Sequence, residues 1–115
     1  MEAGFLTEEQ FRILSKKIIN SIEKRYKIIA LNTLQSLCYT LKRPVYITIE
    51  QEDDTVIASL DDIAAFAYAD TEYEAIGKLC EEIVSIYEDL IEDRANLGPL
   101  PTKWLTFLEE TIVIK

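Results

Sequence analysis

Three short stretches with strand character, separated by polar turns, constrain the fold of this chain more than any other feature. In order, the predicted strands and turns are residues 44–50, the turn 51–54, residues 55–60, the turn Asp61-Asp62, and residues 64–69. In the first strand, Val45, Ile47 and Ile49 alternate with polar or aromatic side chains, which is typical of a strand covered on one face. The order predicts a three-stranded antiparallel meander that needs a cover on at least one face.

A long amphipathic helix over residues 71–95 is predicted to supply that cover. Asp70 or Thr71 is placed to cap it, and Glu72 and Glu74 lie in the first turn, where the helix dipole favours anions. Its apolar stripe comprises Ala75, Ile76, Leu79, Cys80, Ile83, Ile86, Tyr87, Leu90 and Ile91. Gly98 followed by Pro99 is a pair that typically follows the end of a helix.

The end of the chain predicts a short last helix followed by an apolar tail. Pro101 lies near the first turn of that helix, and residues 111–115 have strand character. Three large apolar residues of the helix could anchor an interface, although packing on the core of the same chain is the favoured interpretation. These residues are Trp104, Phe107 and Leu108.

The first 43 residues predict a basic helical arm. Thr7 and Gln10 have the spacing of a capping box, and apolar residues recur at intervals of three or four, so we expect an amphipathic helix over residues 8–25. Its polar face carries Arg12, Lys16, Lys17, Lys24 and Arg25. These side chains form either a solvated face or a contact with an acidic partner or nucleic acid.

Residues 27–43 are ambiguous at the level of the sequence. Leucines at helical spacing favour a helix, but two short apolar runs in the same segment could each be a strand. We expect a helix that Pro44 ends, because proline disfavours helical geometry at the residue before it. The predicted fold is therefore α+β, with a helical arm (1–43), a β-β-β-α core (44–101) and a C-terminal helix and tail (102–115).

Charge is distributed unevenly along the chain, and this distribution bears on the kind of partner that the chain could bind. Residues 1–45 carry eight Lys and Arg against four acids, whereas residues 46–115 carry four against seventeen, for a net charge of −9. An acidic body repels phosphates and therefore disfavours nucleic acid, but it attracts a small basic protein. Because residues 1–4 lack the basic start of a secretory signal and no apolar run is long enough to cross a bilayer, we expect a cytoplasmic protein. Cys38 and Cys80 are expected to be reduced and buried.

The core resembles the HicB-like antitoxin family, in a short form. The resemblance rests on the first strand with its acidic turn (46–54), the second strand (56–60), the approach to Asp70-Thr71, the helix start Thr71-x-x-Glu74-Ala75 and the exit at 97–101. It implies a partial ribonuclease-H-like β-β-β-α fold. It also implies that the chain binds and neutralises a small basic toxin, such as an mRNA interferase.

These observations predict a non-catalytic protein-interaction module without a cofactor or metal. The candidate contacts with a basic partner are the acids of the two turns and of the strand before them: Glu50, Glu52, Asp53, Asp54, Asp61 and Asp62. For each acid taken alone, turn formation and solubility are the favoured explanation. Fold analogy is no more than an associational argument for function.

Three other functions stay open at this stage. A metal-dependent nuclease would need converging carboxylates, and its candidate set is Glu50, Asp61, Asp70 and Glu74. A DNA-binding autoregulator would use the basic N-terminal helix and would require a dimer. A self-assembling structural protein would use the first helix and the tail 112–114 in a symmetric oligomer. An oligomer is expected and is compatible with the interaction module.

Overall fold

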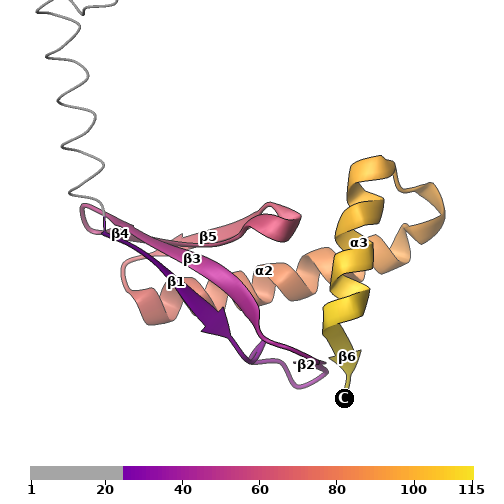
Figure 1. The fold of residues 1–115 in the computed structure, drawn as a ribbon, viewed down its shortest axis with the longest axis horizontal. Coiled ribbons are helices and arrows are strands. Elements are labelled where there is room, and N and C mark those ends of the chain that lie inside the picture. The colour runs from indigo at the N-terminus through magenta and orange to yellow at the C-terminus, as the bar shows by residue number, and fades with distance from the viewer. Residues whose placement is uncertain (1–24) are drawn as a thin grey trace, which may run out of the picture.

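The computed structural model describes residues 25–115, and side chains from Lys27 onwards. Its main element is a four-stranded antiparallel sheet in the order β1-β3-β4-β5 (Figure 1). The strands are β1 (Arg25–Leu31), β3 (Val45–Glu52), β4 (Thr55–Leu60) and β5 (Ala65–Ala69). The α+β class and the meander of β3, β4 and β5 are confirmed, but the predicted three strands are joined by a fourth.

The inner face of the sheet is apolar because apolar side chains recur at every second position of its strands. Ile47 of β3 and Ala58 and Leu60 of β4 are almost completely buried there. Successive side chains of each strand point to opposite faces of the sheet. The position of a residue along its strand therefore decides whether its side chain is covered. The alternation that predicted β3 is confirmed, with Val45 and Ile49 also buried.

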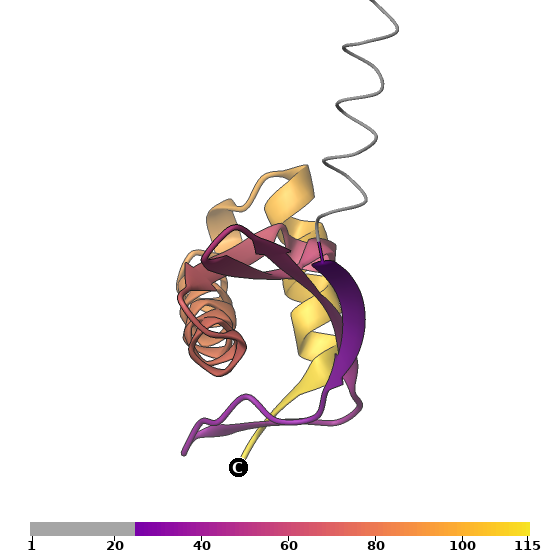
Figure 2. The same cartoon turned by 90° about the vertical axis from the view of Figure 1, so that its left-hand side faces the viewer.

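Helix α2 (Glu72–Glu92) covers this inner face along β4 and β5 (Figure 2). Thr71 is its N-cap: the Thr71 hydroxyl accepts a hydrogen bond from the Glu74 amide at 3.2 Å and donates one to the Glu74 carboxylate at 3.1 Å. Leu79 and Ile83 are fully buried on the stripe that the sequence predicted. Each such side chain contributes about 1.5–3 kcal/mol on leaving water.

Helix α3 (Pro99–Thr111) starts with proline in its first turn and packs against α2 and the short 3-10 helix Asp61–Ile63. Leu108 is fully buried, while Trp104 and Phe107 pack on the edge of the core. Packing of this helix within the same chain is therefore confirmed. Thr111 is buried as well, and its hydroxyl donates to the Phe107 carbonyl at 2.7 Å.

The tail after α3 forms a second, two-stranded sheet with the segment before β3. Strand β6 (Ile112–Ile114) pairs antiparallel with β2 (Tyr39–Leu41). The Lys115 amide donates to the Cys38 carbonyl at 2.8 Å and extends the pairing. The strand character of the tail is confirmed, but the tail pairs within its own chain rather than standing free.

Two predictions for the N-terminal part were wrong. The helix expected over residues 27–43 is absent, because this segment contains β1 and β2 joined by a loop. β1 pairs with β3 along its full length, from Arg25↔Gln51 to Leu31↔Val45, so strand pairing overrides the helical leucine spacing. Cys38 is exposed instead of buried, although both cysteines are free thiols as expected. The predicted helix over residues 8–25 falls almost wholly outside the described residues.

Candidate partner-binding surface

The first group of predicted contact residues lies at the turn between β3 and β4. Asp53 and Asp54 form the turn itself, and Asp53 adopts a positive φ of 54°, which aspartate tolerates better than most residues. Glu52 lies opposite Thr55 in the ladder, and Glu50 lies opposite Ile57 on the outer face of the sheet. Glu50 and Glu52 each have an interaction partner within the chain.

The second predicted group, Asp61 and Asp62, lies at the other end of β4. Both are exposed in the 3-10 helix Asp61–Ile63, and the amide of the following residue, Ala64, donates to the Asp61 carbonyl at 3.1 Å. A strand of this length separates the two groups by roughly 20 Å at about 3.3 Å per residue. The structure therefore keeps the predicted contacts in two separate groups.

A third acidic surface runs along the solvent-exposed side of α2, away from the apolar stripe. Its exposed carboxylates belong to Glu81, Glu82, Glu88, Asp89, Glu92 and Asp93. Lys78 is the one basic residue within α2. The signal was present in the sequence as acids at helical spacing, but nothing in the sequence connected them to a strand edge.

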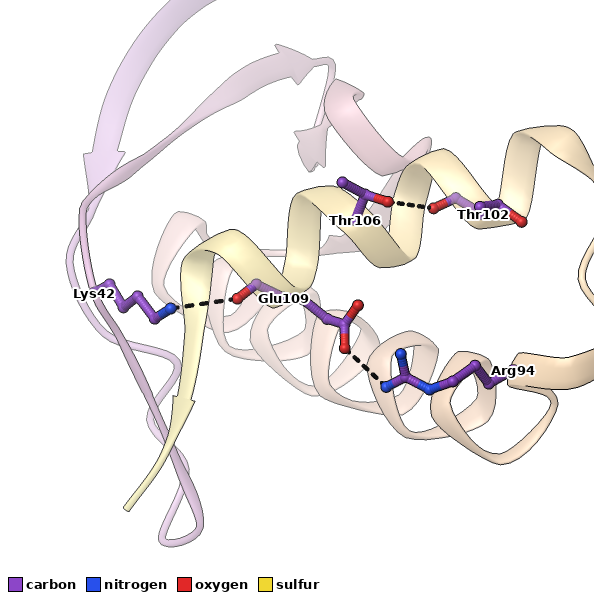
Figure 3. Close-up of polar contacts among 5 residues, drawn as sticks. All are labelled: Lys42, Arg94, Thr102, Thr106 and Glu109. Carbon is purple, nitrogen blue, oxygen red and sulfur yellow. Dashed lines mark hydrogen bonds and ion pairs between the residues drawn. The ribbon is translucent and has the colours of Figure 1, made fainter.

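Some acids of this region are already engaged in holding the fold together. Figure 3 shows the Arg94 guanidinium 2.8 Å from the Glu109 carboxylate, and the Lys42 ammonium 3.5 Å from the Glu109 carbonyl. The Glu109 carboxylate raises the pKa of Arg94 through this hydrogen bond. Lys27 forms a second ion pair, with Glu72 at 3.0 Å. Glu72 and Glu109 are thus each held in an ion pair at the surface of the described part of the chain.

Glu88 also has a partner within the chain, in strand β2. The Tyr39 hydroxyl donates to its carboxylate at 3.0 Å, and this hydrogen bond raises the pKa of Tyr39. The Tyr39 ring meets the Tyr87 ring edge to face, with ring centres 5.5 Å apart. This contact fixes β2 against α2.

A groove lies between α2 and the free side of β5. Its lining residues come from these two elements only: Phe66, Ala67, Tyr68, Lys78, Glu81, Glu82 and Ser85, around a volume of about 550 Å³. Because β4 contributes none of them, the groove follows the edge of β5 that no described strand covers. Two carboxylates against one ammonium make it net acidic.

The outer face of the sheet is uncovered within the described part of the chain (Figure 2). It carries large side chains that are more than half exposed: Ile28 at 61%, Tyr46 at 68%, Phe66 at 61% and Tyr68 at 63%. The register places Ser59 opposite Phe66 and Ile57 opposite Tyr68, so the two aromatic side chains of β5 form an aromatic strip along the sheet edge, beside β4. The strip borders the groove.

No family model, curated protein or solved structure matches the chain. The resemblance to HicB-like antitoxins therefore rests on the sequence pattern alone.

The residues proposed for a nuclease do not form a cluster. Glu50 lies on the outer sheet face, Asp61 at the far end of β4, and Glu74 in the cap of α2. Between residues 25 and 115, no three His, Cys, Asp or Glu side chains lie close enough together to hold a metal ion.

The basic residues predicted to contact nucleic acid fall largely outside the described part of the chain. Arg12, Lys16, Lys17 and Lys24 lie outside the described residues, and Arg25 begins β1. Burial raises the pKa of the Cys80 thiol to about 11, which keeps it protonated and unreactive at neutral pH. In the described part of the chain, no helix is both long and apolar enough to cross a bilayer.

Proposed function

We propose that this chain is a non-catalytic protein-interaction module that binds a small basic protein, as an antitoxin binds the toxin it neutralises. The observation that carries the proposal is the acidic surface of α2. Within residues 25–115, the two ion pairs formed between described side chains use Glu72 and Glu109, whereas Glu81, Glu82, Asp89 and Glu92 point into solvent without one. Unpaired carboxylates on one face raise the association rate with a basic partner.

The candidate toxin is a small basic ribonuclease of the mRNA interferase kind, as the resemblance implies. Support for a non-catalytic role comes from the chemistry of the described residues. Cys80 is a buried, neutral thiol, and among the described residues the carboxylates considered for metal chemistry do not form a group that could hold a metal ion.

Affinity capture tests this proposal. Tagged protein is recovered from an extract of its own cells at low salt, and co-eluting proteins are identified and quantified by mass spectrometry. We expect one small basic protein in near-equal amount, released as salt is raised because exposed charge pairs are screened. Recovery of the tagged protein alone would contradict the proposal.

The charge-reversed variant Asp53→Lys with Asp54→Lys provides the comparison for the residues predicted from sequence. The turn is exposed, so the fold should persist. Reduced recovery of the basic protein would place the contact at this turn. Unchanged recovery would move the contact to another acidic surface of the same domain.

Self-assembly is the second candidate function, and the outer face of the sheet favours it. Ile28, Tyr46, Phe66 and Tyr68 form an exposed apolar surface of the kind that often marks an interface. A homo-oligomer built through this face would be compatible with partner binding elsewhere. Sedimentation of the purified protein over a range of concentrations decides whether it forms.

A further inference from the structure

The two edges of the sheet differ in how they are protected. An edge strand presents unpaired backbone N–H and C=O groups that can pair with another chain, and proteins usually block it with lysine, proline or an inward-pointing charge. β1 carries such a charge, because Lys27 lies on the inner side opposite Ile49 and reaches Glu72. β5 reads Ala-Phe-Ala-Tyr-Ala and carries none of these devices.

The surroundings of β5 leave room for one more strand. Its alanines at positions 65, 67 and 69 face α2, and their small side chains let the helix lie close to the strand. The groove of about 550 Å³ continues from the free edge onto α2, where Glu81, Glu82 and Ser85 line it. A strand edge that no residue of the described part of the chain pairs with, beside an open groove, is the arrangement that β-strand addition uses.

We propose that this groove binds an extended basic segment of the partner, which adds to β5 as a further strand. The proposal deepens the proposed function and rests on it, since it names the surface and the kind of segment bound. Successive residues of an added strand point to opposite sides. On one side they meet Glu81 and Glu82, and on the other they continue the aromatic strip beyond Phe66 and Tyr68.

The segment that fits is therefore an alternating one, with Lys or Arg at every second position and apolar residues between them. A second copy of this chain fits less well. Pairing β5 with the β5 of another copy would bring the Glu81 and Glu82 carboxylates of both copies towards the same joint, where like charges repel. Lys78 alone does not balance them. Charge thus favours a basic strand over self-pairing.

A peptide titration followed by NMR tests the proposal on the full chain. The probe is a seven-residue peptide of alternating lysine and valine, added to ¹⁵N-labelled protein at low salt. We expect shifts and slowed hydrogen exchange at the amides of residues 65–69, together with shifts at Glu81 and Glu82. A glutamate–valine peptide of the same pattern, and a peptide with the lysines and valines in two blocks, should leave these amides unchanged.

Matched charge reversals on α2 separate the groove from general attraction. The variant Glu81→Lys with Glu82→Lys should weaken binding of the lysine–valine peptide by about tenfold or more, since two attractive contacts become repulsive. The comparison variant, Asp89→Lys with Glu92→Lys, makes the same change of charge on the same acidic surface of α2 but outside the groove. It removes general attraction without touching the groove, so it should weaken peptide binding far less. Equal weakening by both variants would overturn the proposal.

The remaining outcomes separate the failure of this proposal from the failure of the proposed function. Peptide-induced shifts at Asp53 and Asp54 with unchanged β5 amides would overturn strand addition and leave binding of a basic partner intact. No shift anywhere would also overturn it, and affinity capture by the wild-type chain would then decide the function independently. Shifts at β5 that appear on raising the protein concentration without peptide would identify a second copy as the occupant.

Discussion

The two faces of the four-stranded sheet are both rich in large apolar side chains, yet they are used differently. On the inner face, Ile47 and Leu60 are buried beneath the helices, whereas Tyr46 and Phe66 on the outer face are more than half exposed. The inner residues are aliphatic and the outer ones are mainly aromatic. The difference separates stability, which depends on the inner face, from recognition, for which the outer face and the β5 edge remain available.

The largest expected effect on stability comes from a substitution between α2 and the inner face of the sheet. Leu79→Asp should unfold the domain, because it buries an unpaired carboxylate between α2 and the sheet at a cost of roughly 3–5 kcal/mol. Circular dichroism during thermal melting measures it. Ser85→Asp adds the same charge at an exposed position of the same helix and should melt cooperatively near the wild-type temperature. A normal melt for Leu79→Asp would mean that α2 packs through another face.

The next effect concerns the buried thiol on the inner side of α2. The pKa of Cys80 is about 11 in the folded protein, against 9.0 as its ordinary value. Between these pH values the unfolded chain loses the thiol proton and the folded chain keeps it, so stability falls as pH rises, by roughly 2 kcal/mol in total. Urea unfolding at pH 8 and pH 11 measures the loss.

The two cysteines form a matched pair for this measurement. Cys80→Ala should remove that part of the pH dependence, and Cys38→Ala, at an exposed thiol, should leave it in place. The same pH dependence of the free energy of unfolding in the wild type and both variants would contradict this. It would show that Cys80 is accessible to water and that the inner face is poorly covered at this position.

A smaller effect is expected at Gly77, which lies between the covered and exposed sides of α2. An added Cβ there would meet only the Gln35 side chain, at an ordinary 3.7 Å. Gly77→Ala should therefore stabilise the domain by about 0.8 kcal/mol through helix propensity. Gly98→Ala should have the opposite sign, because Gly98 is the N-cap of α3 and alanine caps poorly. Chemical denaturation of both variants checks the pair.

The smallest effect is expected on the outer face. Tyr46→Ser should change the free energy of unfolding by less than about 0.5 kcal/mol, because its side chain is mostly in solvent. Denaturation at two protein concentrations is the measurement. A loss above about 2 kcal/mol that grows with concentration would show that the outer face is covered by a second copy, and would remove the distinction between the faces.

The sequence predicted the part of the fold whose signals are local. β3 shows clean alternation, and α2 has both a capping box and an apolar stripe, so both were placed close to their observed bounds. For the segment of β1, the sequence allows a strand but favours a helix. Ile28 and Ile29 are adjacent apolar residues that do not alternate with polar ones, and the following leucines have helical spacing. The identity of β1 depends on pairing with β3, a contact between segments about 20 residues apart.

The candidate site was less accessible from the sequence for a related reason. Acids that are near one another along the chain, such as Asp54 and Asp61, lie at opposite ends of β4. Glu82 and Phe66 are further apart in the chain but line one groove. The last strand of a meander lies at an edge of the sheet unless another element pairs with it. This topological rule was the one signal in the sequence that could have indicated β5 as a binding edge.

Sedimentation of the protein purified from its own cells, at low and at high salt, tests the central claim most directly. We predict a low-salt mass that exceeds one copy of the chain by one small basic polypeptide, and its dissociation at high salt. A mass equal to a whole-number multiple of the chain at both salt concentrations, with no second polypeptide, would contradict partner binding and identify self-assembly through the uncovered sheet face.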